Sequence, residues 1–74
     1  MTLKETVPGR NVKVAGFSDT LSKRHQHHLR AYGLEAGGTV NVLQQRPVTI
    51  IRIDHTELAL DHRIAAQVMV VETA

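Results

Sequence analysis

The chain of 74 residues contains no cysteine. Disulfides, thiolate metal sites, iron–sulfur clusters and cysteine nucleophiles are therefore excluded. A domain of this size buries only about 60% of the surface of its unfolded chain, so its stability must come from a compact apolar core or from self-association. The lack of cysteine fits a reducing compartment, and we expect a cytoplasmic protein.

Aromatic residues are also scarce, because the sequence has no tryptophan and its only rings besides the histidines are Phe17 and Tyr32. A groove for proline-rich peptides is lined by aromatic rings. Single-stranded nucleic acid likewise stacks its bases on aromatic side chains. Two rings cannot build either surface well, so neither kind of ligand is expected.

Long apolar runs are missing, and none approaches the ~20 residues that a membrane-spanning helix needs. The first residues include Lys4 and Glu5 and have no apolar segment typical of a signal peptide. Nine Lys and Arg against seven Asp and Glu give a net charge of only +2. We therefore expect a protein that is soluble, is not inserted in a membrane and does not bind nucleic acid.

Motifs of catalysis are absent from the sequence. The glycines at positions 33, 37 and 38 lack the spacing, and the following Lys-Ser or Lys-Thr, of a phosphate-binding loop. Nothing resembles the strained turn that presents a nucleophilic serine. The sequence therefore predicts a protein that is not an enzyme.

The most informative stretch runs from Leu29 to Gly37 and indicates the end of an amphipathic helix followed by a turn. Gly33 can take the left-handed conformation that ends a helix, and Leu34 can fold back on its last turn. The helix is expected over residues 23–32.

The start of this helix can be capped by Asp19 or by Ser22, since either side chain can accept a backbone N–H. The apolar stripe of the helix is thin and consists of Leu21, Leu29 and Tyr32. One small amphipathic helix of this kind must pack on something larger, which the rest of the chain supplies as strands.

Alternating and β-branched residues predict five short strands, and a single helical turn is expected between the last two. A further turn is expected at Pro8-Gly9. The predicted strands cover residues 10–17, 39–45, 48–53, 57–60 and 68–71, and the helical turn covers residues 61–66. We therefore expect a mainly β single domain over residues 1–74, a small barrel of about five strands with one α-helix inserted after the first strand.

This order of features resembles the ferrous iron transport protein A (FeoA) family, and the resemblance covers essentially the whole chain. The matching segments are Pro8-Gly9, Val12 to Ser18, Leu29, Gly33-Leu34, Gly37, Val40, Val42, Pro47, Leu58-Ala59-Leu60 and Ala65 to Val70.

The resemblance implies an SH3-like β-barrel and an accessory role. Its implied partner is a membrane ferrous iron transporter with a cytoplasmic GTPase domain, and no catalytic residues are implied. SH3-like domains are also appended to metal-dependent repressors, so a metal-responsive or DNA-associated module is the alternative. The sequence has no pair of DNA-reading helices, which favours the transport role.

Two surfaces are candidates for contact with a partner. The first is the helix with its basic residues Lys23, Arg24, His27 and Arg30, which could dock on an acidic patch. The second is the edge near Arg46-Pro47. Small barrels with open edges often pair symmetrically, so a homodimer is a further alternative.

Histidines offer the only candidate metal site. His25 and His28 are three residues apart on the expected helix, and two imidazoles at that spacing can share a divalent ion. Asp61 and His62 add a carboxylate–imidazole pair. Zinc or iron could bind there, although the sequence names no complete ligand set, no cofactor is required, and the same histidines are explained as surface or packing residues.

Overall fold

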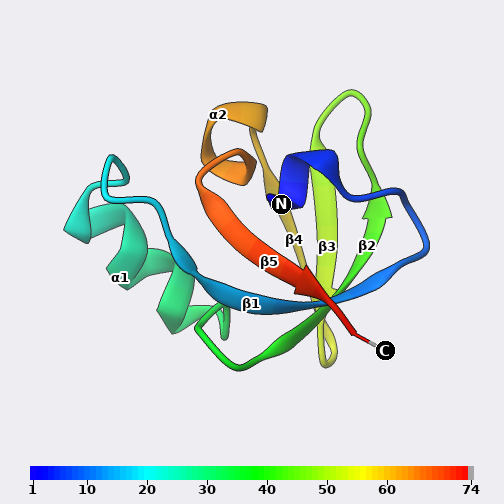
Figure 1. Cartoon of the computed structure of the whole chain (residues 1–74), viewed down its shortest axis with the longest axis horizontal. Coiled ribbons are helices and arrows are strands. Elements are labelled where there is room, and N and C mark those ends of the chain that lie inside the picture. The colour runs from blue at the N-terminus through cyan, green and yellow to red at the C-terminus, as the bar shows by residue number, and fades with distance from the viewer. Residues whose placement is uncertain (74) are drawn as a thin grey trace.

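The fold, seen in a computed structural model that describes residues 1–73, is a five-stranded antiparallel sheet with two short α-helices (Figure 1). Its elements are the 3-10 helix η1 (Leu3–Glu5), β1 (Asn11–Phe17), α1 (Lys23–Ala31), β2 (Thr39–Gln44), β3 (Thr49–Ile53), β4 (Thr56–Leu60), α2 (His62–Ala65) and β5 (Val68–Glu72). The predicted mainly β fold with one helix after the first strand is confirmed. Within the described part, no helix is long and apolar enough to cross a membrane.

The strands lie in the order β4-β3-β2-β1-β5, so the sheet has β4 at one edge and β5 at the other. The register shifts between Val14 and Gly16 in β1, and again between Val42 and Gln44 in β2. Such bulges bend a strand and increase its twist. The bends curve the sheet around one apolar core, made of Leu3, Val12, Val14, Leu21, Leu29, Leu34, Val40, Val42, Ile51, Ile53, Leu60, Ala65, Val68 and Val70.

The alternation predicted for the first strands is confirmed. Val12 and Val14 of β1 are buried, as are Val40 and Val42 of β2. Because successive side chains of a strand point to opposite faces, their neighbours lie on the outer face. There Asn41 donates a hydrogen bond to Asn11 across the strands at 2.8 Å.

Helix α1 ends one residue earlier than predicted, and its end is fixed as expected by Gly33, whose φ is 97°. The N–H of Gly33 donates to the carbonyl of Arg30 at 2.9 Å, and the N–H of Leu34 to that of Leu29 at 3.0 Å. This pair of bonds is the Schellman motif, and it carries Leu34 into the core. The place given to Tyr32 in the apolar stripe is wrong, because its side chain is 56% exposed at the helix end.

The start of α1 is capped by Ser22 and not by Asp19. The Ser22 hydroxyl accepts the backbone N–H of His25 at 3.2 Å. We expect Ser22→Ala to lower the free energy of unfolding by about 1 kcal/mol, because a backbone donor at the helix start loses its partner. Chemical denaturation measures the change. Asp19→Ala is the matched control and should stay within about 0.5 kcal/mol of the parent; an equal loss in both variants would contradict this assignment of the cap.

Element η1 is not predicted by the sequence, yet it places Leu3 fully inside the core. The element is held by Gln45, in the loop between β2 and β3. The Gln45 amide nitrogen donates to the carbonyls of Leu3 and Thr6, both at 2.7 Å. The Gln45 amide oxygen accepts the hydroxyl of the fully buried Thr49 at 2.6 Å. One side chain therefore joins the first residues of the chain to the middle of the sheet.

Candidate functional site

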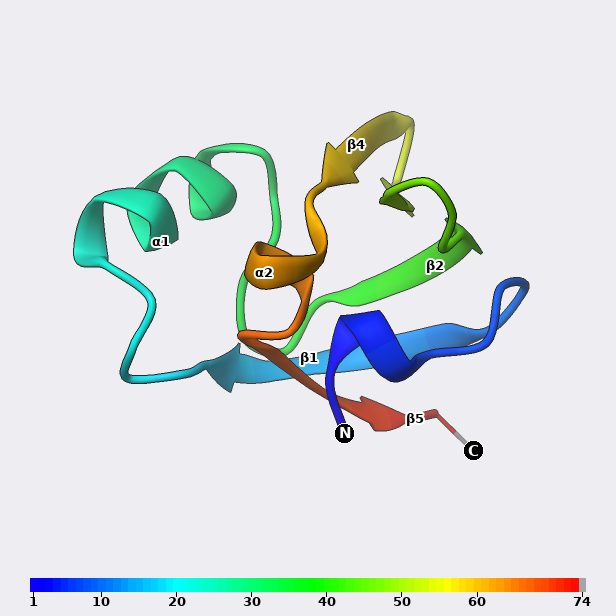
Figure 2. The same ribbon diagram turned by 90° about the horizontal axis from the view of Figure 1, so that it is seen from above.

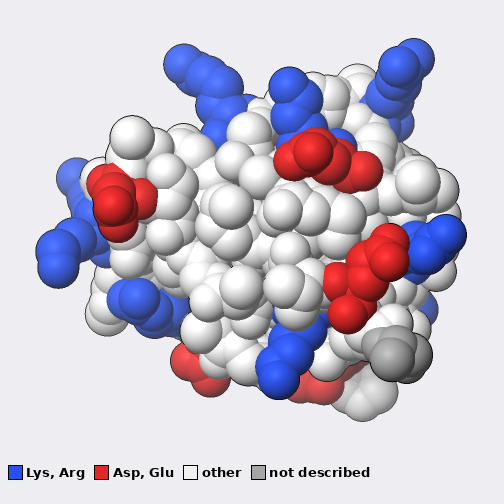
Figure 3. All heavy atoms as spheres, in the orientation of Figure 1, with Lys and Arg blue, Asp and Glu red and all other residues white. Residues whose placement is uncertain are grey.

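Helix α1 presents a cationic surface. Lys23, Arg24, His27 and Arg30, the four residues predicted to bind a partner, are all exposed. The helix contains no acidic residue in its sequence KRHQHHLRA. In Figure 3, lysine and arginine atoms project at the α1 end of the molecule, on the left, with an acidic group close by. Leu29 is the single buried residue of α1, so most of the helix surface faces outward.

Arg30 differs from the other cationic residues because it is held in place. Its guanidinium carbon lies 5.4 Å from the centre of the Phe17 ring, at the end of β1. It also donates to the Gln26 side chain at 3.4 Å. Cation–π contacts of this kind contribute about 0.5–1 kcal/mol at exposed sites. Arg30 therefore helps to hold α1 against the barrel, whereas the side chains of Lys23 and Arg24 form no ion pair among residues 1–73.

A hollow of about 590 Å³ lies where α1, the end of β4 and α2 meet. In the view of Figure 2, α2 lies between α1 and β4. The hollow has buried apolar residues and a polar rim, and its lining residues are Thr20, Leu21, Ser22, His25, His28, Leu29, Ala59, Leu60, Asp61, Arg63, Ile64 and Gln67.

Three of the four predicted metal ligands line this hollow, namely His25, His28 and Asp61. The fourth, His62, does not, because its Nε2 lies 2.7 Å from the carbonyl oxygen of Gln45. Within residues 1–73, no three His, Asp or Glu side chains are placed so that they could hold a metal ion. The His25 Nδ1 instead lies 3.0 Å from the Ser22 hydroxyl. Metal binding at these residues stays a prediction.

The contribution of α2 to this surface is not predicted by the sequence. Arg63, Ile64 and Gln67 come from α2 and the turn after it. Asp61 caps α2 by accepting the N–H of Ile64 at 2.9 Å. The helical turn itself was predicted, but only the closing of the sheet brings it beside α1. His28 and Arg63 lie far apart in the sequence, so no local pattern indicates that they line the same hollow.

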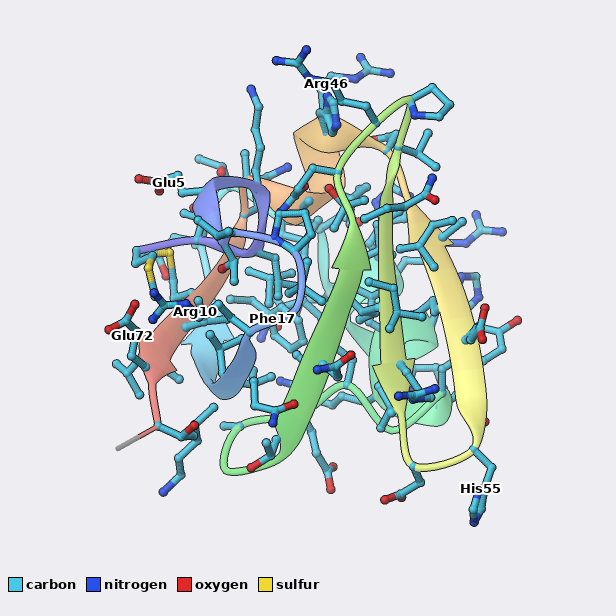
Figure 4. All side chains as sticks on the ribbon, turned by 90° about the vertical axis from the view of Figure 1, so that its right-hand side faces the viewer. Glu5, Arg10, Phe17, Arg46, His55 and Glu72 are labelled. Atoms are coloured by element: carbon cyan, nitrogen blue, oxygen red, sulfur yellow. The ribbon has the colours of Figure 1, made fainter. Side chains whose placement is uncertain are left out.

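The second predicted contact surface lies elsewhere. Figure 4 shows Arg46 at the tip of the loop between β2 and β3 and His55 at the tip of the β3–β4 hairpin, at opposite ends of the sheet. The Arg46–Pro47 peptide bond is cis. On a third side of the molecule, Arg10 and Glu72 point toward one another and form an exposed ion pair at 3.4 Å.

A family model described as the FeoA domain matches residues 1–72. The chain belongs to the FeoA family. A crystal structure of an iron uptake regulatory protein (FeoA) is 26% identical with a TM-score of 0.85, over 99% of this chain and 96% of that protein. The FeoA of Stenotrophomonas maltophilia, complexed with zinc and described as a prokaryotic SH3 domain protein, is 25% identical with a TM-score of 0.82, over 96% and 89%. The predicted SH3-like fold is thereby confirmed.

Repressors share the same fold. A manganese-dependent transcriptional repressor is 21% identical with a TM-score of 0.87, and the match covers 99% of this chain but 41% of the repressor. At that identity the likeness shows the fold alone. Comparison with curated proteins gives no match. The link of this chain to ferrous iron transport therefore comes from its family.

Proposed function

We propose that the protein is a cytoplasmic, non-enzymatic accessory of ferrous iron transport, which binds the GTPase domain of a membrane transporter through α1. Membership of the FeoA family supports the transport role. The observation that carries the choice of surface is the exposed helix α1, which bears Lys23 and Arg24 and has no acidic residue.

Electrostatics makes α1 suitable for this contact. Neither Lys23 nor Arg24 takes part in an ion pair within the described residues, where the pair formed is Arg10 with Glu72. Free cationic groups attract an acidic surface and speed the encounter of two proteins. Salt at physiological strength screens such charges over about 8 Å. The contact should therefore weaken as the salt concentration rises.

The test is a calorimetric titration of this protein into the isolated GTPase domain of the transporter from the same organism. It is run with and without guanine nucleotide, in metal-free buffer. Saturable binding that weakens with salt is expected, and dependence on nucleotide would indicate regulation. Absence of heat in every condition, with a folded GTPase domain that binds nucleotide, would contradict the proposal.

Reversing the charge of α1 should weaken this binding. For Lys23→Glu with Arg24→Glu we expect about a tenfold rise in Kd, since two attractive charges become repulsive. The variant should stay folded, because acidic residues are favourable in the first turn of a helix. Lys4→Glu with Lys13→Glu makes the same charge change on η1 and β1 and should change Kd less than about twofold. An equal rise in Kd for both double variants would show that binding depends on the net charge of the protein and not on the charges of α1.

A resident metal is not part of this proposal. His25 and His28 lie near each other on α1, but a partner would have to supply the remaining ligands of a zinc site. Self-association, the remaining prediction from the sequence, is tested by the same samples, because a homodimer would give heat on dilution of the protein alone.

A further inference from the structure

The two edges of the sheet differ in whether another segment of backbone pairs with them. At the β5 edge, Thr2 forms a bridge with Met69, and the N–H of Val70 donates to the carbonyl of Met1 at 2.9 Å. At the β4 edge, β4 pairs with β3 alone, and no other strand of the described chain lies beside it. An uncovered edge carries unpaired backbone groups that can bond to another strand.

The register of the β3–β4 hairpin identifies these groups. Ile53 pairs with Thr56 across a two-residue turn in which Asp54 has a φ of 53°. The pair that closes such a turn exchanges hydrogen bonds, and bonded and non-bonded pairs then alternate along the hairpin. The backbone groups of Thr56, Leu58 and Leu60 therefore bond to β3.

Glu57 and Ala59 occupy the alternate positions of β4, so their N–H and C=O groups point away from β3. None of the loop and turn backbone hydrogen bonds among residues 1–73 involves either residue. Two N–H and two C=O groups are thus available at the spacing of an added antiparallel or parallel strand.

The uncovered edge of β4 borders the hollow. Ala59 and Leu60 of β4 line it together with Leu29 of α1 and Ile64 of α2. Leu29 and Leu60 are buried and Ile64 is half-buried. A strand added beside Ala59 would therefore bond to β4 on one side and place alternate side chains on apolar surface between the helices.

The charges around the hollow favour an acidic occupant. Arg63 lines it, and Lys23 and Arg24 lie exposed on α1, the helix that borders it. Asp61 is the single acidic residue of the lining, and one of its oxygens already accepts the N–H of Ile64. Acidic side chains are attracted to such a surface, and basic ones are repelled.

We propose that the open edge of β4 binds an extended, acidic segment of a partner protein, which joins the sheet as an added strand and fills the hollow between α1 and α2. The proposal deepens the function given above and rests on it only for the identity of the partner. Backbone bonds supply affinity in this mode, and the pockets for alternate side chains supply specificity.

Amide hydrogen exchange measured by NMR tests the added strand directly. In the protein alone, the Ala59 amide should exchange fast, because it has no partner. Two probes are then added separately: the GTPase domain, and a short synthetic peptide of alternating glutamate and valine. We expect each to slow the exchange of the Ala59 amide about tenfold or more, and a peptide of alternating lysine and valine to leave it unchanged.

Two variants measured by calorimetry accompany the exchange data. Ala59→Pro removes the outward N–H without removing a bond to β3, as proline does at free edges, and should raise Kd about tenfold. Arg63→Glu should raise Kd about threefold to fivefold and keeps α2 folded, because the change lies in the first turn of a helix. Lys13→Glu on β1 is the matched control and should change Kd less than about twofold.

The outcomes separate this inference from the proposed function. Slowed exchange with the acidic peptide but no binding of the GTPase domain would support the added strand and reject that partner. Binding of the GTPase domain with unchanged exchange at Ala59, and with Ala59→Pro binding like the parent, would overturn the added strand alone. Exchange that slows with the concentration of the protein itself would assign the edge to a second copy and overturn the proposal, as would unchanged exchange with both probes.

Discussion

Replacing Gln45 with alanine should lower the free energy of unfolding by about 3 kcal/mol. The Gln45 side chain uses both of its donors, on the carbonyls of Leu3 and Thr6, and accepts the hydroxyl of Thr49. Thr49 is fully buried, and Thr6 is buried as well. Removing the amide leaves the Thr6 carbonyl and the Thr49 hydroxyl without partners, at about 1–3 kcal/mol for each group that water cannot reach. The Leu3 carbonyl keeps one partner, the backbone N–H of Thr6 at 3.2 Å. Urea denaturation followed by circular dichroism measures the change.

The neighbouring glutamine is the control for this prediction. Gln44, the last residue of β2, donates once through its side chain, to the carbonyl of Arg46 at 3.0 Å. Gln44→Ala should change the free energy of unfolding by no more than about 0.5 kcal/mol. A double-mutant cycle of Gln45→Ala with Thr49→Val should show a coupling of about 1 kcal/mol or more, because the two side chains bond directly. Equal effects of Gln44→Ala and Gln45→Ala would contradict the role of Gln45.

Replacing Leu34 with alanine should have a similar effect, a loss of about 3 kcal/mol within the range of about 2–5 for a buried leucine. The Leu34 side chain is fully buried, and its backbone N–H ends α1 by bonding to Leu29. The variant keeps this backbone bond and loses the packing alone. Because Leu34 ties the end of α1 to the core, the cationic surface should also become less well fixed. Thermal denaturation and the NMR line widths of α1 report the two effects separately.

Leu43→Ala is the matched control for Leu34→Ala. Leu43 lies at the bulge of β2 and is half-buried, so the same change of side chain removes less buried surface. We expect a loss of about 1 kcal/mol. If Leu43→Ala destabilised the protein as much as Leu34→Ala, the stabilisation would not follow the burial of the two side chains, and the account of Leu34 would be contradicted.

The regular elements were predictable because their signals are local. Alternation places Val12 and Val14 of β1 inward, and Gly33 with Leu34 ends α1 as expected. The exposure of Tyr32 was not predictable, because spacing along a helix does not reveal where the helix leaves the core. Element η1 was missed for a related reason, since its position depends on Gln45, a residue far along the chain whose local pattern is that of an ordinary strand end.

The candidate site was predictable only in part. The cationic residues of α1 follow from the sequence, and three of the four residues named as metal ligands do line one hollow. His62 is the exception, since it turns to the carbonyl of Gln45. The open edge of β4 could not be foreseen, because it depends on the strand order β4-β3-β2-β1-β5, and no single segment carries that information.

The central claim is that α1 and the surface beside it contact the transporter. NMR chemical-shift mapping of this protein, titrated with the isolated GTPase domain, tests that claim most directly. We expect the largest shifts in α1 and in the residues of β4 and α2 that line the hollow, with Lys23, Arg24 and Ala59 among them. Shifts centred instead on the loop at Arg46 or on β5, with α1 unaffected, would contradict it.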